Sequence, residues 1–181
     1  MKKRFIAAIL SLAMLAAPAA ARAQLGVGAS APDFSTQGAL AGKSYAFHLR
    51  AALRKGPVVL YFYPKAFTRG CTLEAHAFAG AMDDFRAAGA SVVGMSNDDL
   101  STLKRFSTEA CRDSFPVAIA SPAIIAAYDV ALNRQGLPAG LADRTSYVIA
   151  PDGRIAFVHS DLDYRDHVRL TLAAVKALQA R

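Results

Sequence analysis

The residues most able to do chemistry in this chain are its two cysteines, Cys71 and Cys111. Cys71 follows a short turn and opens a segment with helical periodicity, so its thiol is predicted in a first helical turn. Unpaired backbone N–H groups and the positive end of the helix dipole stabilise a thiolate there, and the thiolate is the nucleophilic form of cysteine. The alternative is a small buried apolar residue, the usual role of a free cysteine. Because Cys71 follows a turn and opens a helix, the role of nucleophile is favoured over that of a buried apolar residue.

Other residues near Cys71 in the sequence suit the same chemistry. Thr68 can place a hydroxyl near the sulfur, where it can accept a hydrogen bond from a bound substrate or donate one to it. Pro64 ends the preceding apolar run, fixes the backbone and lacks an N–H, which shields the pocket. A carboxylate in the first helical turn is stabilised by the helix dipole, which explains Glu74 without a functional role. From the sequence alone, Arg144 is best explained as a surface arginine paired with its neighbouring aspartate.

The four histidines give no persuasive metal-binding pattern. A metal site needs closely spaced ligands that converge, and His48, His76, His159 and His167 are spread over predicted strands and helices. Surface positions, or core positions with satisfied hydrogen bonds, explain all four. Since no glycine-rich fingerprint suggests a nucleotide either, we expect neither a metal nor a cofactor.

The first 23 residues are predicted to be a cleaved signal peptide. Three basic residues precede an apolar run from Phe5 to Ala17, and Ala21-Arg22-Ala23 provides the small-x-small pattern at which signal peptidase cuts. The apolar run is shorter than the about 20 residues that span a bilayer, which disfavours a retained membrane anchor. We therefore expect an exported, periplasmic protein that has no membrane contact after cleavage.

Residues 24–181 are predicted to form one domain. Their 158 residues fall within the usual range of about 100–200 per domain. Without the four basic residues of the leader, 17 Lys and Arg face 14 Asp and Glu, which leaves a net charge of +3. No run of basic residues is interleaved with aromatic ones, so binding to nucleic acid or to a membrane surface is not expected. Two cysteines permit a single disulfide in an oxidising compartment.

The hydrophobic pattern predicts alternating strands and helices. The expected strands lie at 44–49, 57–63, 90–95, 115–118, 145–150 and 154–159. The expected helices lie at 71–88, from caps at Asn97 and Asp98 to about 110, at 122–128 and at 164–178, with an extended lead-in at 24–36 and a loop at 132–143. A βαβ unit followed by a ββα unit indicates an α/β, thioredoxin-like fold with a central mixed sheet flanked by helices.

The segment around Cys71 resembles that of the peroxiredoxins. Pro64, Thr68 and Cys71 match the P-x-x-x-T-x-x-C motif of that family in full. The flanking segments 58–63 and 71–74, with the lead-in Ala31-Pro32-Asp33-Phe34, resemble the bacterioferritin-comigratory, or Q-type, subfamily. The resemblance covers nearly all of residues 24–181.

This resemblance implies a thiol-dependent peroxidase that reduces hydrogen peroxide and organic hydroperoxides. It makes Cys71 the peroxidatic cysteine, with Pro64 and Thr68 lining the peroxide pocket. Arg144 matches the arginine that stabilises the thiolate and orients the peroxide, and Glu74 is a supporting residue. The implied partners are a hydroperoxide and an external dithiol reductant, thioredoxin-like or another periplasmic thiol protein. We expect a monomer or a weak homodimer.

The chain departs from these relatives at the second thiol. His76 stands where many Q-type members have a second cysteine, and Arg69 stands where a proline is common. Other members place a resolving cysteine at the position of Ser107, one helical turn before Cys111. We predict that Cys71, once oxidised to a sulfenic acid, condenses with Cys111 after local unravelling of both helix ends. The alternative is a core role for Cys111, with an external thiol resolving the sulfenic acid.

Two other functions occur on the same fold and are alternatives here. A thioredoxin-type disulfide exchanger needs C-x-x-C, but Thr68 stands where the partner thiol would be. A non-catalytic copper-delivery or thiol-binding protein would use C-x-x-x-C, and Ala75 stands in place of that second ligand. Both patterns are incomplete, so the peroxidase is preferred.

Overall fold

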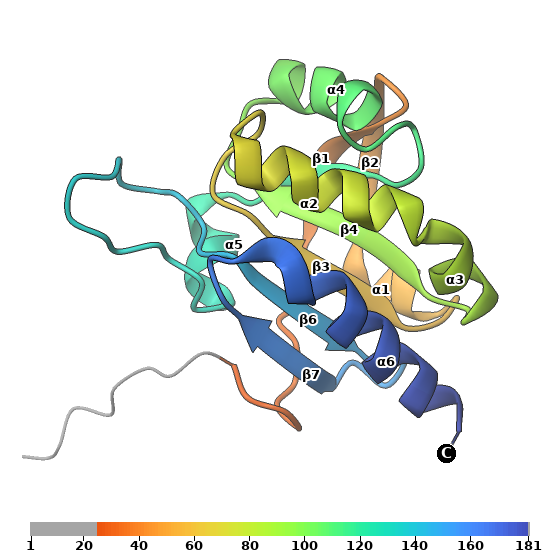
Figure 1. Cartoon of the computed structure of the whole chain (residues 1–181). Coiled ribbons are helices and arrows are strands. Elements are labelled where there is room, and N and C mark those ends of the chain that lie inside the picture. Colours follow the sequence, from red (N-terminus) through yellow and green to blue (C-terminus); the bar gives the residue numbers. More distant parts are fainter. Residues whose placement is uncertain (1–24, 181) are drawn as a thin grey trace, which may run out of the picture.

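The computed structural model describes residues 25–180, so the predicted signal peptide lies outside the described residues. A seven-stranded mixed sheet, in the order β2-β1-β5-β4-β3-β6-β7, carries helices on both faces (Figure 1). The strands are β1 (Ser35–Leu40), β2 (Lys43–His48), β3 (Val58–Phe62), β4 (Ser91–Ser96), β5 (Val117–Ile119), β6 (Thr145–Ile149) and β7 (Ile155–Ser160). The predicted fold class is confirmed.

Strand β3 is an inner strand of the sheet, and its residues are apolar on both faces. It pairs in parallel with β4 and antiparallel with β6, and all five of its residues are buried. Val59 and Tyr61 point into one hydrophobic cluster, while Leu60 and Phe62 point into the other. This is the burial expected for an inner strand without alternation, and it carries the chain directly to the Cys71 loop.

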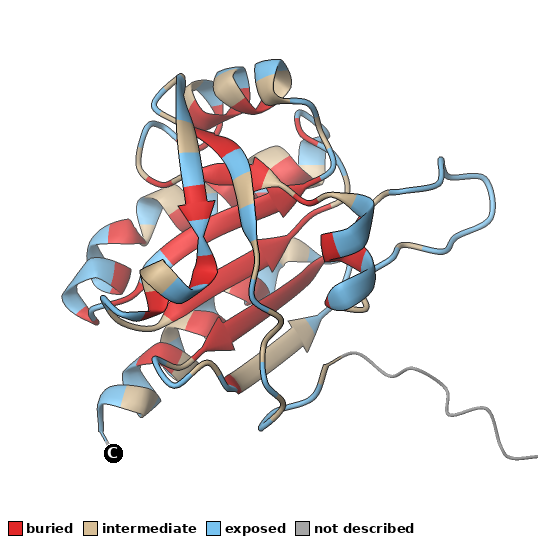
Figure 2. Ribbon diagram, turned by 180° about the vertical axis from the view of Figure 1, so that it is seen from behind, coloured by how far each residue is buried: buried red, intermediate tan, exposed pale blue. Residues whose placement is uncertain are grey.

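The helices divide between the two faces of the sheet. The face that carries Cys71 is covered by α2 (Arg69–Gly80), α3 (Met82–Ala87), α4 (Leu100–Glu109) and α6 (His167–Gln179). The opposite face, seen in Figure 2, is covered by α1 (Leu49–Leu53) and α5 (Pro122–Ala127). A short 3₁₀ turn, η1 (Tyr164–Asp166), leads into α6.

The single helix predicted at 71–88 is two helices. α2 ends at Gly80 and α3 begins at Met82, with Ala81 at φ −99° and ψ 2° between them. Glycine is a poor helix former, by about 1 kcal/mol relative to alanine, which favours a break at this point. The apolar residues Phe78, Met82 and Phe85, spaced at i, i+4 and i+7 across the break, are nevertheless all buried.

Two elements near the N-terminus were not predicted. Strand β1 carries no apolar alternation: the predicted lead-in at 24–36 covers only its first two residues, and no element is predicted for the rest. It forms by pairing with β2 through a tight turn. Ala41 and Gly42 in that turn both have positive φ, 50° and 73°, as two-residue hairpin turns require. Helix α1 is only five residues long, too short to give a periodic signal.

The boundaries of α4 and α6 also differ from the prediction. The N-cap of α4 is Asp99, whose side chain accepts from the Thr102 N–H, rather than Asn97 or Asp98. In α6 the fully buried residues are His167, Thr171 and Val175. The apolar residues Val168 and Leu172 beside them are partly buried and pack against the same core cluster as Val175.

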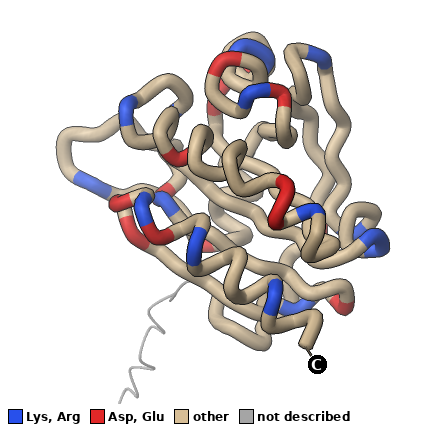
Figure 3. Tube along the Cα trace, turned by 45° about the vertical axis from the view of Figure 1, so that its right-hand side comes forward, with Lys and Arg blue, Asp and Glu red and all other residues tan. Residues whose placement is uncertain are grey.

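The charged residues are not concentrated on one surface of the molecule. Figure 3 shows basic and acidic positions interspersed along helices and loops. Within residues 25–180, no helix has both the length and the apolar character needed to cross a bilayer.

Candidate active site

Cys71 is the third residue of α2, as the prediction of a first-turn position requires. Thr68 is the N-cap, and its carbonyl accepts the first helical hydrogen bond, from the Thr72 N–H at 2.9 Å. The N–H groups of Arg69, Gly70 and Cys71 precede that bond, so they point out of the helix end near the sulfur. Cys71 itself is 1% exposed. The chain therefore places a buried thiol at the positive end of a three-turn helix.

Arg144 directly precedes β6 and brings a positive charge to this sulfur. Its Nη2 donates to Cys71 Sγ at 3.4 Å, and its Nη1 donates to Glu74 Oε2. Its Nε donates to the Leu162 carbonyl at 2.8 Å. The side chain is buried and does not pair with Asp143, which instead accepts from the Arg144 backbone N–H. The guanidinium thus has a fixed position and faces two acidic groups.

Gly70 allows the Arg144 guanidinium to lie close to the Cys71 sulfur. A Cβ at position 70 would lie 3.2 Å from Arg144 Nη2, closer than ordinary van der Waals contact. A larger residue here would push the guanidinium away from the sulfur.

The protonation of Glu74 determines how the Arg144 charge is shared. Burial raises the pKa of the Glu74 carboxyl to about 8, although the charge and hydrogen bond of Arg144 oppose this. Burial lowers the pKa of Arg144, but the neighbouring Glu74 and Cys71 outweigh it and keep the guanidinium protonated. Burial therefore favours the uncharged form of Glu74, the form that leaves the Arg144 charge to Cys71.

Thr68 and Pro64 occupy the loop between β3 and α2. The Thr68 hydroxyl donates to the Lys65 carbonyl at 3.0 Å, so its lone pairs face outward as acceptors. Pro64 follows Tyr63, whose N–H extends the β3–β4 pairing by donating to the Met95 carbonyl. Neither side chain contacts the sulfur by a hydrogen bond among the described contacts. The roles assigned to them stay predictions.

The same loop is attached to the start of α4. Asp98 Oδ2 accepts hydrogen bonds from the Ala66 N–H and the Ser96 hydroxyl, both at 2.8 Å. Phe67 has a φ of 64° and packs edge-on against Phe106 of α4, with ring centroids 5.2 Å apart. The Cys71 loop is thereby connected to the helix that leads to Cys111.

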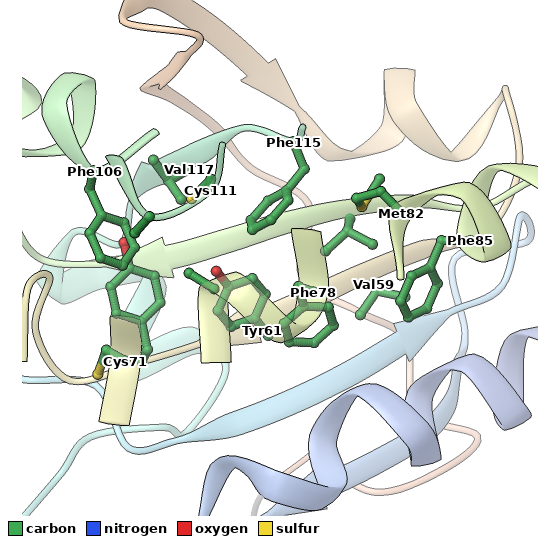
Figure 4. Packing of buried hydrophobic residues seen from close by; sticks show 14 of the residues in the cluster. Val59, Tyr61, Cys71, Phe78, Met82, Phe85, Phe106, Cys111, Phe115 and Val117 are labelled. Atoms are coloured by element: carbon green, nitrogen blue, oxygen red, sulfur yellow. The ribbon is translucent and has the colours of Figure 1, made fainter. Parts of the chain in front are cut away.

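Cys111 lies just beyond the end of α4, not inside the helix as predicted. Its thiol is fully buried and free, as is that of Cys71. Burial, and to a smaller extent the charge of Asp113, raises the pKa of this thiol well above its ordinary range. In Figure 4 the two cysteines lie on different sides of a cluster of aromatic rings that includes Tyr61 and Phe106. The two thiols are not paired in this conformation.

Sequence reasoning missed the residues behind Arg144. The Leu162 carbonyl holds the guanidinium, and His167 contacts the adjacent Asp161 carbonyl at 2.9 Å and the Ser146 hydroxyl at 2.8 Å. No sequence pattern marks a backbone carbonyl as a ligand. His167 was detectable, because it shares the buried face of α6 with residues four and eight positions later.

The fold and the site together define a class of enzymes in which a buried helix-end thiol acts beside an arginine on a thioredoxin-like scaffold. Residues 27–158 match the model of the AhpC/TSA family, and the chain belongs to this family. Peroxiredoxin Bcp of Xanthomonas campestris is 31% identical over 123 residues, which are 66% of this chain and 76% of the relative. Chloroplastic peroxiredoxin Q of Oryza sativa subsp. japonica is 31% identical over 127 residues, 67% of this chain and 55% of the relative.

Solved structures give the same assignment. Peroxidoxin BcpB from Mycobacterium tuberculosis superposes with a TM-score of 0.75 and 30% identity, covering 85% of this chain and 98% of that one. Peroxiredoxin Q of Xanthomonas campestris superposes with a TM-score of 0.67 and 29% identity, covering 78% and 89%. The predicted resemblance to Bcp- and Q-type peroxiredoxins is confirmed, and the chain is a thiol-dependent peroxidase.

Proposed function

We propose that this protein reduces hydrogen peroxide and organic hydroperoxides through a Cys71 thiolate that becomes a sulfenic acid. One observation carries the proposal: Arg144 Nη2 lies 3.4 Å from a buried sulfur at the start of α2. A fixed cation and a helix N-terminus on the same atom favour the thiolate and stabilise charge that develops next to it.

In the first step the thiolate attacks one oxygen of the O–O bond. An S–O bond forms, the O–O bond breaks, and the leaving oxygen departs as water or an alcohol after taking up a proton. The sulfur is oxidised by two electrons and the peroxide is reduced. Arg144 stabilises the developing negative charge on the oxygens, Thr68 accepts a hydrogen bond from the peroxide O–H, and Pro64 keeps competing water from the pocket.

In the second step Cys111 resolves the sulfenic acid. Its sulfur attacks the Cys71 sulfur, an S–S bond forms and water leaves, so that the pair stays at the same oxidation level. Both thiols are buried, and the pKa of Cys111 is raised by burial and by Asp113. The reaction therefore requires the segments around both cysteines to open, which exposes Cys111 and restores its reactivity.

The test is stopped-flow consumption of hydrogen peroxide and cumene hydroperoxide by the reduced protein without residues 1–23. We expect rapid loss of one peroxide per protein, abolished in Cys71→Ser and preserved in Cys111→Ala during the first turnover. Consumption no faster than that of a free thiol would refute the peroxidase.

Mass spectrometry of the quenched product tests the second step. A product two mass units lighter contains the Cys71–Cys111 disulfide, and peptide mapping without reductant locates the bond. A product heavier by one oxygen would instead show that an external thiol resolves Cys71.

We further propose that the protein acts after export, with a periplasmic dithiol protein as the reductant. The pattern of residues 1–23 supports export. N-terminal sequencing of the protein from a periplasmic fraction tests it: a start near Gln24 is expected, and retention of Met1 in the cytosol would contradict it. The expected monomer or weak homodimer is measured by sedimentation of the same sample.

A further inference from the structure

His167, the first residue of α6, is fully buried behind the active site and its two ring nitrogens both have polar partners. Nε2 lies 2.9 Å from the Asp161 carbonyl, which can only accept, so Nε2 carries the proton. Nδ1 is therefore the acceptor for the Ser146 hydroxyl, 2.8 Å away. The imidazole is held in a single tautomer and orientation.

The Asp161 contact leads to the catalytic arginine through the backbone. The Asp161 N–H donates to the Arg144 carbonyl at 3.2 Å, and the next carbonyl, that of Leu162, accepts from Arg144 Nε at 2.8 Å. The segment 161–162 thus holds Arg144 by its main chain and by its guanidinium. His167 anchors that segment to α6.

The Ser146 side of the ring leads to the same arginine. Ser146 lies in β6, two residues after Arg144, and is fully buried. His167 Nδ1 also faces Glu74 Oε1 at 3.8 Å, and this oxygen has no hydrogen-bond partner among the described residues. The imidazole therefore forms the back wall of the Glu74–Arg144 pair.

Charged and titratable groups surround this ring from four elements. Glu74 faces it from α2, Arg144 from the start of β6, His159 from β7 with ring centroids 4.6 Å apart, and Asp161 from the following loop. Burial, together with the charges of His159 and Arg144, lowers the pKa of His167 to about 4, although the hydrogen bond to the Asp161 carbonyl and the charge of Asp161 oppose this. The ring is neutral at physiological pH, so it adds no second cation beside Arg144.

We propose that His167 is a positioning residue for the peroxidase reaction: it holds the 161–162 segment and Ser146 so that Arg144 stays in contact with the Cys71 sulfur. The inference rests on the proposed function and extends it. His167 touches neither sulfur nor peroxide, and it acts through Arg144 alone. A misplacement of about 1 Å is enough to cost on the order of 100-fold in rate at a preorganised site.

The test compares His167→Leu, which removes both polar contacts, with His167→Gln, whose amide reaches the Asp161 carbonyl as Nε2 does. Two quantities are measured: the second-order rate constant with hydrogen peroxide, and the midpoint pH of Cys71 alkylation by iodoacetamide, followed on the Cys71 peptide. His76→Leu is the control, because His76 is a partly exposed histidine of α2 outside the network.

In His167→Leu we expect the rate constant to fall about 10- to 100-fold and the alkylation midpoint to rise, because Arg144 no longer stabilises the thiolate fully. In His167→Gln the rate constant and the alkylation midpoint should both return most of the way to the wild-type values, and His76→Leu should change neither quantity. A purely structural role would lower the unfolding temperature and leave the alkylation midpoint in place, which would overturn the inference.

A replacement variant and a measurement without peroxide cover the cases in which His167→Leu does not fold or the wild type is inactive. If His167→Leu does not fold, His167→Asn replaces it; Asn lacks the reach to Asp161, so its midpoint must rise relative to that of His167→Gln, and equal midpoints overturn the inference. If the wild type consumes no peroxide, the proposed function fails. The alkylation midpoint still decides the role of His167, because that measurement requires no peroxide.

Discussion

The two cysteines of this protein are equally buried, yet different groups surround their sulfur atoms. Cys71 sits at a helix N-terminus with Arg144 Nη2 at 3.4 Å. Cys111 sits beyond a helix C-terminus among apolar side chains, with Asp113 as a nearby charge that raises its pKa further. The comparison shows that burial by itself does not make a thiol inert or reactive.

What distinguishes the two sites is the sign of the electrostatic potential. A helix begins with unpaired N–H groups and ends with unpaired carbonyls, so the same thiol is favoured as an anion at one end and disfavoured at the other. The arginine adds to this difference at Cys71. On the proposed mechanism, Cys71 is therefore ready for attack in the folded protein, while Cys111 becomes reactive only when its segment opens.

The largest expected effect is selectivity of native alkylation. Both thiols are buried, so the expected difference comes from their charge state. On the proposed mechanism Arg144 and the helix N-terminus favour the Cys71 thiolate, the form that iodoacetamide attacks, whereas burial and Asp113 keep the Cys111 thiol protonated, so Cys71 should react at least about a thousandfold faster. Peptide mapping after timed quenching measures both rates, and both thiols should react alike in denaturant. Comparable native rates would remove the distinction between the two sites.

Arg144→Ala should produce the next largest effect. Loss of a positioned donor typically costs about 100- to 1,000-fold, and we expect a comparable fall in the rate constant with peroxide. Arg144→Lys should recover only part of it, because an ammonium cannot bind the sulfur, Glu74 and the Leu162 carbonyl together. Arg169→Ala, which removes an exposed arginine of α6 paired with Asp166, is the matched control. A loss in Arg144→Ala no greater than in this control would mean that the helix end alone activates Cys71.

Glu74→Gln should change the dependence of stability on pH. The pKa of Glu74 is raised in the folded state, to about 8. Such a group contributes stability that is full below its unfolded pKa and lost as pH rises through about 8. The unfolding temperature of the wild type should therefore fall relative to that of Glu74→Gln as the pH rises from about 5 to about 8, by about 2–4 °C per kcal/mol. Parallel melting curves for the two proteins over that range would show that Glu74 is already ionised.

The smallest expected effect concerns the connection between the two cysteine segments. Asp98→Ala removes the acceptor of the Ala66 N–H, a partly exposed bond worth about 1 kcal/mol, so disulfide formation should accelerate roughly fivefold. Quenched-flow mass spectrometry follows the loss of two mass units. Asp152→Ala, in the exposed β6–β7 turn, is the control, and identical rates in both variants would mean that opening does not involve this bond.

Local sequence determined the elements that position Cys71. The apolar run of β3, the turn at Pro64 and the periodic segment after Cys71 act within a few residues of one another, so the buried strand and the helix-end thiol were predicted correctly. The wider resemblance to the family added Arg144 and Glu74, which the sequence alone explains as a surface arginine and a first-turn carboxylate. Elements with weak local signals, such as β1 and α1, were missed because pairing and packing create them.

Only the tertiary structure decided which groups meet at the sulfur. Arg144 is 73 residues from Cys71 in the sequence, and it reaches the thiol because β6 pairs with β3 in one register. The same packing places the Leu162 carbonyl and His167 behind the guanidinium, and separates Cys111 from Cys71 by aromatic rings. Local propensities act over a few residues, whereas these contacts depend on how distant segments are brought together, which no short stretch of the chain encodes.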